Sequence, residues 1–256
     1  MDRSESIRRQ FGAAAERYAV SSYHTLSPDL DHMLEASTFS GQERVLDVGT
    51  GTGHTALAFA PQVAHVTGID LTEAMLEQAR RLAREQGVSN VSFELGDAMQ
   101  LALPDAHFDR VTCRVCAHHF ANPQAAVHEA ARVLRPGGEL VLVDTVSPPD
   151  PAQDTFLNTI ELLRDPSHVR NYSVVEWEAM LGAAGLTGGC VSNWSFPLDF
   201  EDWVERMRTP EHERGQLRRL FDAAPDAVRD VLNVRGGDAP YGFDIPVALF
   251  VATRPS

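Results

Sequence analysis

A glycine-rich segment in the first third of the chain is framed by two acidic residues. Asp47 precedes Gly49, Gly51 and Gly53, which occupy alternate positions, and Asp70 ends the next apolar stretch. Glycine tolerates positive φ and has no Cβ, so the backbone can turn sharply here and a flat ligand can lie against it. A carboxylate ahead of the turn suits a ligand with a cationic end, and a carboxylate beyond it can accept both hydroxyls of a ribose.

The spacing of these residues distinguishes between two kinds of nucleotide ligand. A dinucleotide-binding turn has its third glycine at the position that His54 occupies, and Asp47 would repel a pyrophosphate. A nucleoside that carries a positive, amino-acid-like tail satisfies both acids, and S-adenosylmethionine (SAM) is such a molecule. The pattern therefore favours a SAM site over the site of a nicotinamide dehydrogenase.

A second group of reactive side chains follows the apolar run 108–115. His118 and His119 are ionisable near neutral pH, so either can take a proton from an oxygen or nitrogen nucleophile. They can equally pack or hydrogen-bond at a pocket wall. With Cys113 and Cys116 they also match a zinc spacing in outline. Because Cys113 falls inside a predicted buried strand, two small buried thiols are the simpler interpretation, and no metal is predicted.

These residues require an open sheet of parallel strands with helices between them. Short apolar runs alternate with stretches of helical period, which is typical of α/β proteins. Strands are predicted at 45–48, 63–69, 91–95, 108–115, 140–143, 186–196 and 245–252, and helices at about 4–20, 28–36, 54–61, 72–87, 122–134, 156–163 and 177–184. The Pro-Gly-Gly segment 136–138 is expected to stop the helix before it. Ligands of such sheets bind at the carboxyl ends of the strands, where the strand order reverses, so the glycine turn and the histidines are expected at one edge.

Five segments resemble, in order and at characteristic distances, the successive motifs of class I SAM-dependent methyltransferases. They are 45–53, Asp70, 96–98, 108–114 and 134–138. The pattern of 108–150 is similar to the UbiE-like (methyltransferase type 11) group, whose members methylate quinone precursors and many secondary metabolites. The resemblance implies a doubly wound, mostly parallel, seven-stranded Rossmann-like α/β sheet with a final antiparallel strand and helical lid additions.

The resemblance also implies a set of residues that contact the cofactor. They are Asp47, Gly49, Thr50, Gly51, Gly53, Asp70, Leu71, Asp97, Ala98, Arg114 and, in an N-terminal helix, Tyr18. A carboxylate at position 97 can accept the exocyclic amino group of adenine. The alternative for Asp97 is that it only caps the short turn before Leu101.

Helices beyond the minimal fold are expected to shape the substrate side. One domain, 1–256, is predicted to contain N-terminal helices over the cofactor at 1–40, a SAM-binding core at 40–146, and helical additions at 147–172 and 199–235. His168 and Arg170 are substrate candidates, because Arg binds carboxylate or phosphate groups bidentately, although both can be structural caps. Asp144 follows the strand 140–143 and can contact the substrate or simply form a turn.

Charge and residue usage exclude several classes of function. The 256 residues carry a net charge of −14, and all 22 basic residues are Arg. A field of this sign disfavours nucleic acid and anionic membranes, and 114–117 replaces the [DN]-P-P-[YF] tetrad of nucleic-acid base methyltransferases. The absence of Lys removes P-loop and Schiff-base lysines. Three cysteines and no long apolar segment predict a cytoplasmic protein, either a monomer or a homodimer.

The function expected from these observations is methyl transfer from SAM to a small-molecule acceptor with an O, N or C nucleophile. His118 or His119 is the expected base. The alternative is a SAM-binding protein of the same fold with a cyclase-like or regulatory role.

Overall fold

The computed structural model describes residues 5, 8, 10–12, 15, 28–236 and 240–256. Tyr18, which was expected over the cofactor, lies outside the described residues, as does most of the helix predicted at 4–20.

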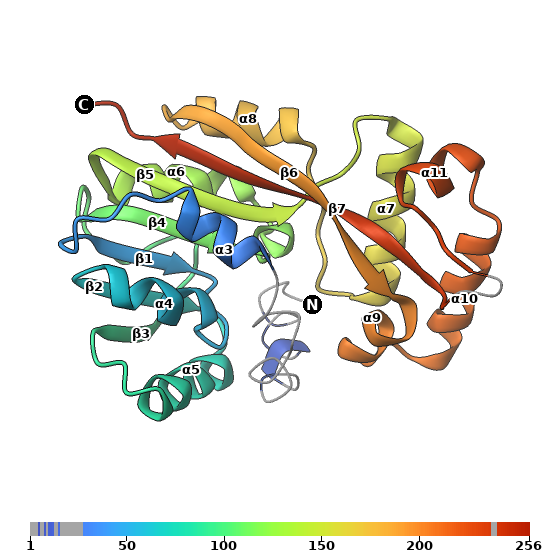
Figure 1. Cartoon of the computed structure of the whole chain (residues 1–256), viewed down its shortest axis with the longest axis horizontal. Coiled ribbons are helices and arrows are strands. Elements are labelled where there is room, and N and C mark those ends of the chain that lie inside the picture. Colours follow the sequence, from blue (N-terminus) through green and yellow to red (C-terminus); the bar gives the residue numbers. More distant parts are fainter. Residues whose placement is uncertain (1–4, 6–7, 9, 13–14, 16–27, 237–239) are drawn as a thin grey trace.

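The core is one seven-stranded sheet, in the order β3-β2-β1-β4-β5-β7-β6 (Figure 1). Its strands are β1 (Arg44–Val48), β2 (His65–Asp70), β3 (Val91–Leu95), β4 (Phe108–Arg114), β5 (Leu134–Thr145), β6 (Thr187–Asp199) and β7 (Gly242–Thr253). The pairs from β3 to β5 are parallel, and β7 runs antiparallel to both β5 and β6. The predicted fold class is therefore confirmed. Strand order reverses between β1 and β4, which opens a ligand-binding crevice at their carboxyl ends.

Helices cover both faces of this sheet, as the apolar period of the sequence requires. They are α3 (Pro28–Glu35), α4 (His54–Phe59), η1 (Ala60–Gln62), α5 (Glu73–Glu85), η2 (Ala117–His119), α6 (Pro123–Val133), α7 (Pro151–Arg164), α8 (Val174–Ala183), α9 (Phe200–Arg206), α10 (Glu211–Asp222) and α11 (Asp226–Val231). Residues of α3, α4 and α5 share one buried cluster, and residues of α6 and α8 share a second. No described helix is both long enough and apolar enough to cross a bilayer.

The start of β5 differs from the prediction. Helix α6 ends at Val133, but the Pro-Gly-Gly segment 136–138 is already part of the strand. Leu134 pairs with Phe108, and the register then shifts before Arg110 pairs with Glu139. The amide of Gly137 also donates to the carbonyl of Arg254, so pairing with distant residues overrides the local turn tendency.

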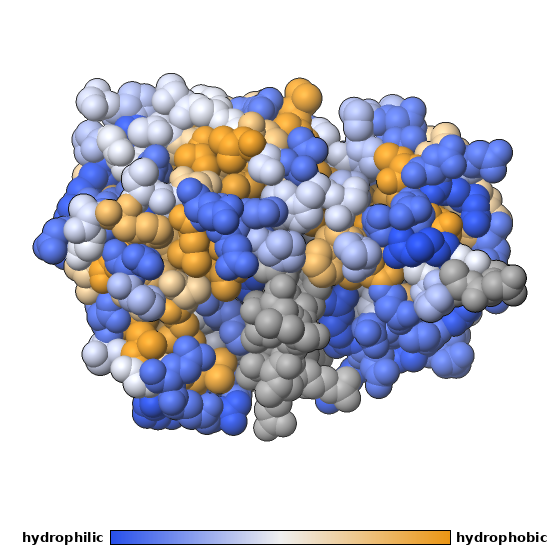
Figure 2. Space-filling model, viewed as in Figure 1, coloured by the Kyte–Doolittle hydropathy of each residue, from blue (hydrophilic) through white to orange (hydrophobic). Residues whose placement is uncertain are grey.

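β6 and β7 extend past the rest of the sheet, and α7, α9, α10 and α11 pack around this extension (Figure 1). Phe243 of β7 is 1% exposed and contacts Trp203 and Phe221, with ring centroids 4.9 Å and 4.8 Å away. Hydrophilic residues cover most of the outer surface of these helices in the view of Figure 2. The additions are therefore amphipathic, with their apolar sides on the extended strands.

Candidate active site

The turn after β1 is held open by its glycines. Gly49, Gly51 and Gly53 have φ values of 65°, 54° and 85°, in the region that residues with a Cβ rarely adopt. The turn is closed by the amide of Thr50, which donates to the carbonyl of Ile69 over 2.9 Å. A Cβ on Gly49 would lie 2.4 Å from Sγ of Cys116, whereas nothing lies within 4 Å of one on Gly51. The backbone at Gly51 therefore faces open space.

Asp47 lies beneath this turn and is 1% exposed. Its carboxylate accepts hydrogen bonds from Oγ1 of Thr50 over 2.6 Å and Oγ1 of Thr112 over 2.7 Å. Burial raises the pKa of Asp47 to about 6, against the opposing effects of the two hydroxyls and Arg114. Asp47 ties the turn to β4 in this structure, and direct contact with a ligand stays a prediction.

Asp70 ends β2 and faces the turn from the other side. Oδ2 accepts from the amide of Gly51 over 3.0 Å, and Oδ1 accepts from the amide of Thr72 over 2.9 Å. Burial raises the pKa of the Asp70 carboxyl, which these two hydrogen bonds oppose. The two amides fix the orientation of the carboxylate beside the open turn.

A cavity of about 120 Å³, the glycine-turn cavity, lies over the ends of β1, β2 and β4. The residues predicted for the cofactor that line it are Gly49, Thr50, Gly51, Asp70, Leu71, Asp97, Ala98 and Arg114. Asp97 also accepts from the amide of Met99 over 2.8 Å, so it both forms a turn and faces the cavity. Asp47 and Gly53 are not among its lining residues, and Met75 lines it although the sequence predicted only a packing role for it.

Arg114 connects this cavity to α3. Its Nε donates to Oγ1 of Thr55 over 3.0 Å, and its Nη1 forms an ion pair with Asp29 over 3.2 Å. Both side chains of the pair are nearly inaccessible to solvent, at 6% and 3% exposure. Val115, the next residue, has a φ of 51°, which is strained for a β-branched side chain. The chain turns here from β4 toward η2, which contains the two histidines.

His118 is fixed by Asp144, a fully buried residue of β5. Nδ1 of His118 lies 2.6 Å from Oδ1 of Asp144, and the amide of His118 donates to Oδ2 over 2.9 Å. Burial alone would lower the pKa of His118, but the charge and hydrogen bond of Asp144, with the charges of Glu161 and Asp165, raise it overall. The sequence analysis singled out both residues but did not predict that they contact each other.

His119 has a different environment although its ring lies only 4.2 Å from that of His118, between centroids. Burial and the charge of His118 lower the pKa of His119 to about 4, so its ring is neutral at physiological pH. Nδ1 lies 3.3 Å from Oγ of Ser167, and the ring of Phe11 packs edge-on at 4.9 Å.

A second cavity of about 70 Å³, the histidine cavity, adjoins the first. Phe11, Val115 and His119 line both cavities. The remaining wall of the histidine cavity is formed by His118, Thr145, Glu161, Arg164, Asp165, Leu198, Trp203, Arg206 and Ile245. The sequence analysis did not predict the charged residues that α7 and α9 contribute to this wall. The charged residues at the end of the predicted helix 156–163 could have indicated them.

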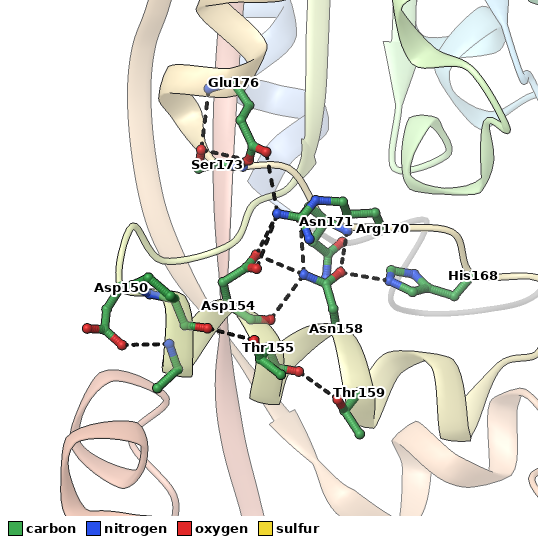
Figure 3. Close-up of polar contacts among 12 residues, drawn as sticks. Asp150, Asp154, Thr155, Asn158, Thr159, His168, Arg170, Asn171, Ser173 and Glu176 are labelled. Atoms are coloured by element: carbon green, nitrogen blue, oxygen red, sulfur yellow. Dashed lines mark hydrogen bonds and ion pairs between the residues drawn. The ribbon is translucent and has the colours of Figure 1, made fainter.

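Arg170 and His168, predicted as substrate contacts, line neither cavity. Nη2 of Arg170 lies 3.2 Å from the carboxylate of Asp154 and 3.4 Å from that of Glu176 (Figure 3). Nε2 of His168 lies 3.2 Å from Oδ1 of Asn158, which projects from α7 in the same view. This loop still contacts the site, because the amides of residues 169 and 170 donate to the carbonyl of His118 and the ring of His168 lies 5.6 Å from that of His118, between centroids. A substrate contact for either side chain stays a prediction.

The two cysteines near the histidines contact each other. Sγ of Cys113 and Sγ of Cys116 are 3.2 Å apart, and the thiol of Cys116 donates to the carbonyl of Val48 over 3.4 Å. In the part of the chain that the structure describes, no group of three or more His, Cys, Asp or Glu residues is arranged to bind a metal ion.

The sheet order, the glycine turn after β1, the acid that ends β2 and the adjoining cavities together define the class I SAM-dependent methyltransferases. The chain belongs to the methyltransferase family, because residues 46–142 match the family model of a methyltransferase domain. It is 42% identical over 220 residues to the uncharacterized methyltransferase YcgJ of Bacillus subtilis, covering 86% of this chain and 87% of the relative. The protein is therefore a SAM-dependent methyltransferase.

Two further likenesses extend this result. The crystal structure of YcgJ from Bacillus subtilis superimposes with a TM-score of 0.87 at 39% identity, covering 89% of this chain and 98% of that one. A demethylmenaquinone methyltransferase of Deinococcus radiodurans is 38% identical over 164 residues, which are 60% of this chain and 65% of the relative.

Proposed function

We propose that the protein transfers the methyl group of SAM to a small-molecule acceptor in the histidine cavity, with His118 as the general base. The observation that carries this proposal is that His118, which is paired with Asp144, lines a cavity that adjoins the glycine-turn cavity at Val115 and His119. Quinone or secondary metabolism is the proposed context. The likeness to a demethylmenaquinone methyltransferase supports it, and the net charge of −14 favours a small molecule over nucleic acid.

The glycine-turn cavity fits the cofactor. The open space at Gly51 admits a ligand against the backbone, and Asp70 is oriented to accept ribose hydroxyls. In this proposal Asp97 accepts a hydrogen bond from the adenine amino group, and Ala98 and Met99, which line the same cavity, form the apolar cover of the ring. Bound SAM supplies an electrophilic methyl group, so the chain mainly has to align the acceptor, exclude water and move one proton.

Asp144 prepares His118 for that proton. In the neutral imidazole, Nδ1–H donates to Asp144 and the lone pair is on Nε2, which can accept a proton from the acceptor. The negative charge of Asp144 then stabilises the imidazolium that forms. His119, with its low pKa, stays neutral and serves as a wall between the cavities.

The test follows the methyl group. The protein is incubated with SAM that carries a labelled methyl group and with quinol or phenol acceptors. The label is expected in the acceptor, and one S-adenosylhomocysteine should form per transfer. His118→Ala should reduce kcat by roughly 10²–10⁴-fold, while the dissociation constant of SAM stays unchanged. His128→Ala, at an exposed position of α6, is the matched control and should retain full activity. Acceptor conversion without S-adenosylhomocysteine would instead establish the cyclase-like alternative.

A further inference from the structure

The wall of the histidine cavity contains a buried ion pair. Glu161 and Arg164 lie one turn apart at the end of α7, and Oε2 of Glu161 is 3.2 Å from Nη1 of Arg164. The side chains are 7% and 14% exposed. Arg164 is held further by α9, because its Nε donates to the carbonyl of Trp203 over 3.0 Å and its guanidinium lies 5.1 Å from the centre of the Trp203 ring.

Asp165, the next charged residue of this wall, is also satisfied within the protein. Its Oδ1 accepts from the amide and the hydroxyl of Ser167 over 2.8 Å and 2.6 Å, and its Oδ2 lies 4.0 Å from Nε2 of His119. Arg206 of α9 adds a second guanidinium. Apart from His118 and His119, the described wall thus contains two carboxylates and two guanidinium groups.

This balance disfavours a charged acceptor. A carboxylate ligand would compete with Glu161 for Arg164, and an ammonium ligand would compete with Arg164 for Glu161. Either exchange leaves one buried protein charge without its partner, which is strongly unfavourable where water is excluded. A neutral acceptor leaves the pair intact.

The rest of the wall indicates the chemical character of the part of the acceptor that is not methylated. Phe11, Val115, Leu198, Trp203 and Ile245 present apolar surface to the cavity, which suits an aromatic or aliphatic body. A proton acceptor such as histidine works best on a hydroxyl whose pKa is not far above its own. A phenol, with a pKa of about 10, meets this condition far better than an aliphatic alcohol.

Building on the proposed function, we infer that the histidine cavity takes an uncharged phenolic acceptor, and that the Glu161–Arg164 ion pair selects it against charged analogues. The phenol hydroxyl faces His118, and the apolar side of the wall contacts the ring. Glu161 and Arg164 are specificity residues in this arrangement, since their pairing is lost whenever a charged acceptor binds.

Three phenols whose side chains are similar in length but differ in charge test the inference. They are tyrosol (neutral), para-hydroxyphenylacetate (anionic) and tyramine (cationic), each titrated calorimetrically into the full chain saturated with S-adenosylhomocysteine. Tyrosol is expected to bind at least about tenfold more tightly than either charged analogue. Equal affinities, or no saturable binding of tyrosol, would overturn the inference.

Two variants, each of which removes one charge of the ion pair, test its role. Glu161→Gln leaves both guanidinium groups in the wall, so the preference for tyrosol over para-hydroxyphenylacetate should fall by about tenfold. Arg164→Gln should shift selectivity in the same way toward tyramine. Glu139→Gln is the control, because it removes the ion pair that Glu139 forms with Arg110 over 2.8 Å, outside both cavities. It should leave the relative affinities of the three phenols unchanged.

Unchanged selectivity in both Glu161→Gln and Arg164→Gln would contradict the role assigned to the Glu161–Arg164 ion pair. Failure of the proposed function gives a different result, in which tyrosol binds with the expected selectivity but no S-adenosylhomocysteine forms from SAM.

Discussion

The contact between His118 and Asp144 sets the pH range in which the ring of His118, the proposed base, is neutral. The carboxylate holds the pKa of His118 above its ordinary value although burial acts in the opposite direction. Only the neutral ring accepts a proton, so kcat/KM should rise with pH through this raised pKa. The same shift makes the pair a source of stability that is fully present below the ordinary pKa of 6.5 and is lost as pH rises through the folded-state value.

Asp144→Asn should separate these two effects. The amide removes the charge that raises the pKa of His118 while burial remains, so the ascending limb of the kcat/KM profile should move to lower pH. The maximum rate should fall by roughly 10²-fold or more, because the amide no longer enforces the required tautomer. Measured pH–rate profiles check both effects. Asp109→Asn, at a carboxylate paired with Arg135 over 2.7 Å, is the control and should keep the wild-type profile. An ascending limb that stays in place in Asp144→Asn would rule out Asp144 as the source of the shift.

For single residues, the sequence indicated which side chains lie in or beside the two cavities better than it indicated their partners. Residue type and position after a strand were enough to name His118, Asp144 and Asp70. The pairing of His118 with Asp144 depends on the register of β4 against β5, which places Arg114 opposite Val143. Arg170 shows the reverse case, since its residue type suggested an anion site while the nearby carboxylates Asp154 and Glu176 already bind it. Neither outcome can be derived from spacing alone.

Among the elements, the turn between β1 and α4 depends on Gly49 for two separate reasons. Its φ of 65° disfavours any Cβ, and an added Cβ would lie 2.4 Å from Sγ of Cys116. Gly137, at the start of β5, shares only the first property, because its φ is 80° and an added Cβ meets nothing within 4 Å.

Substituting alanine at these two glycines should therefore separate steric overlap from backbone strain. Gly137→Ala is expected to cost about 1–2 kcal/mol of unfolding free energy through strain alone. Gly49→Ala should cost roughly 1–3 kcal/mol more, because Cys116 is packed against the turn. Urea denaturation measures both values. Adding Cys116→Ala to Gly49→Ala should recover part of the difference, and equal losses in the two single variants would show that the contact with Cys116 is unimportant.

Prediction of elements succeeded where apolar period and end signals agreed. β1, β2, β3 and β4 lie within a residue or two of their predicted ranges because each is a short apolar run bounded by turn residues. The prediction for β5 was wrong at its start, because the strand already includes segment 136–138, in which Gly137 and Gly138 pair with the backbone of Arg254. β6 and β7 run further than predicted, from 187 to 199 and from 242 to 253, because they continue to pair with each other beyond the parallel sheet.

In the fold as a whole, β7 joins the parallel sheet to the helical additions. Its second half pairs with β5, while its first half lies among α7, α9 and α10 (Figure 1). One buried cluster extends accordingly from Val141 and Leu249 in the sheet to Leu157, Trp203 and Phe221 in the additions. Since the apolar contacts are continuous, the sheet and the additions are expected to unfold together.

Phe243→Ala tests this coupling. The ring is buried where β7 meets Trp203 and Phe221, so its loss should cost about 3–5 kcal/mol. If the sheet and the additions unfold as one unit, the substitution destabilises both together. The calorimetric trace should then keep a single transition at a lower Tm, with calorimetric and van't Hoff enthalpies still equal. Val191→Ala, at a position 57% exposed on β6, should change the stability by less than about 0.5 kcal/mol. A trace that splits into two transitions, only one of them lowered by Phe243→Ala, would mean that the additions fold as a separate unit above the catalytic sheet.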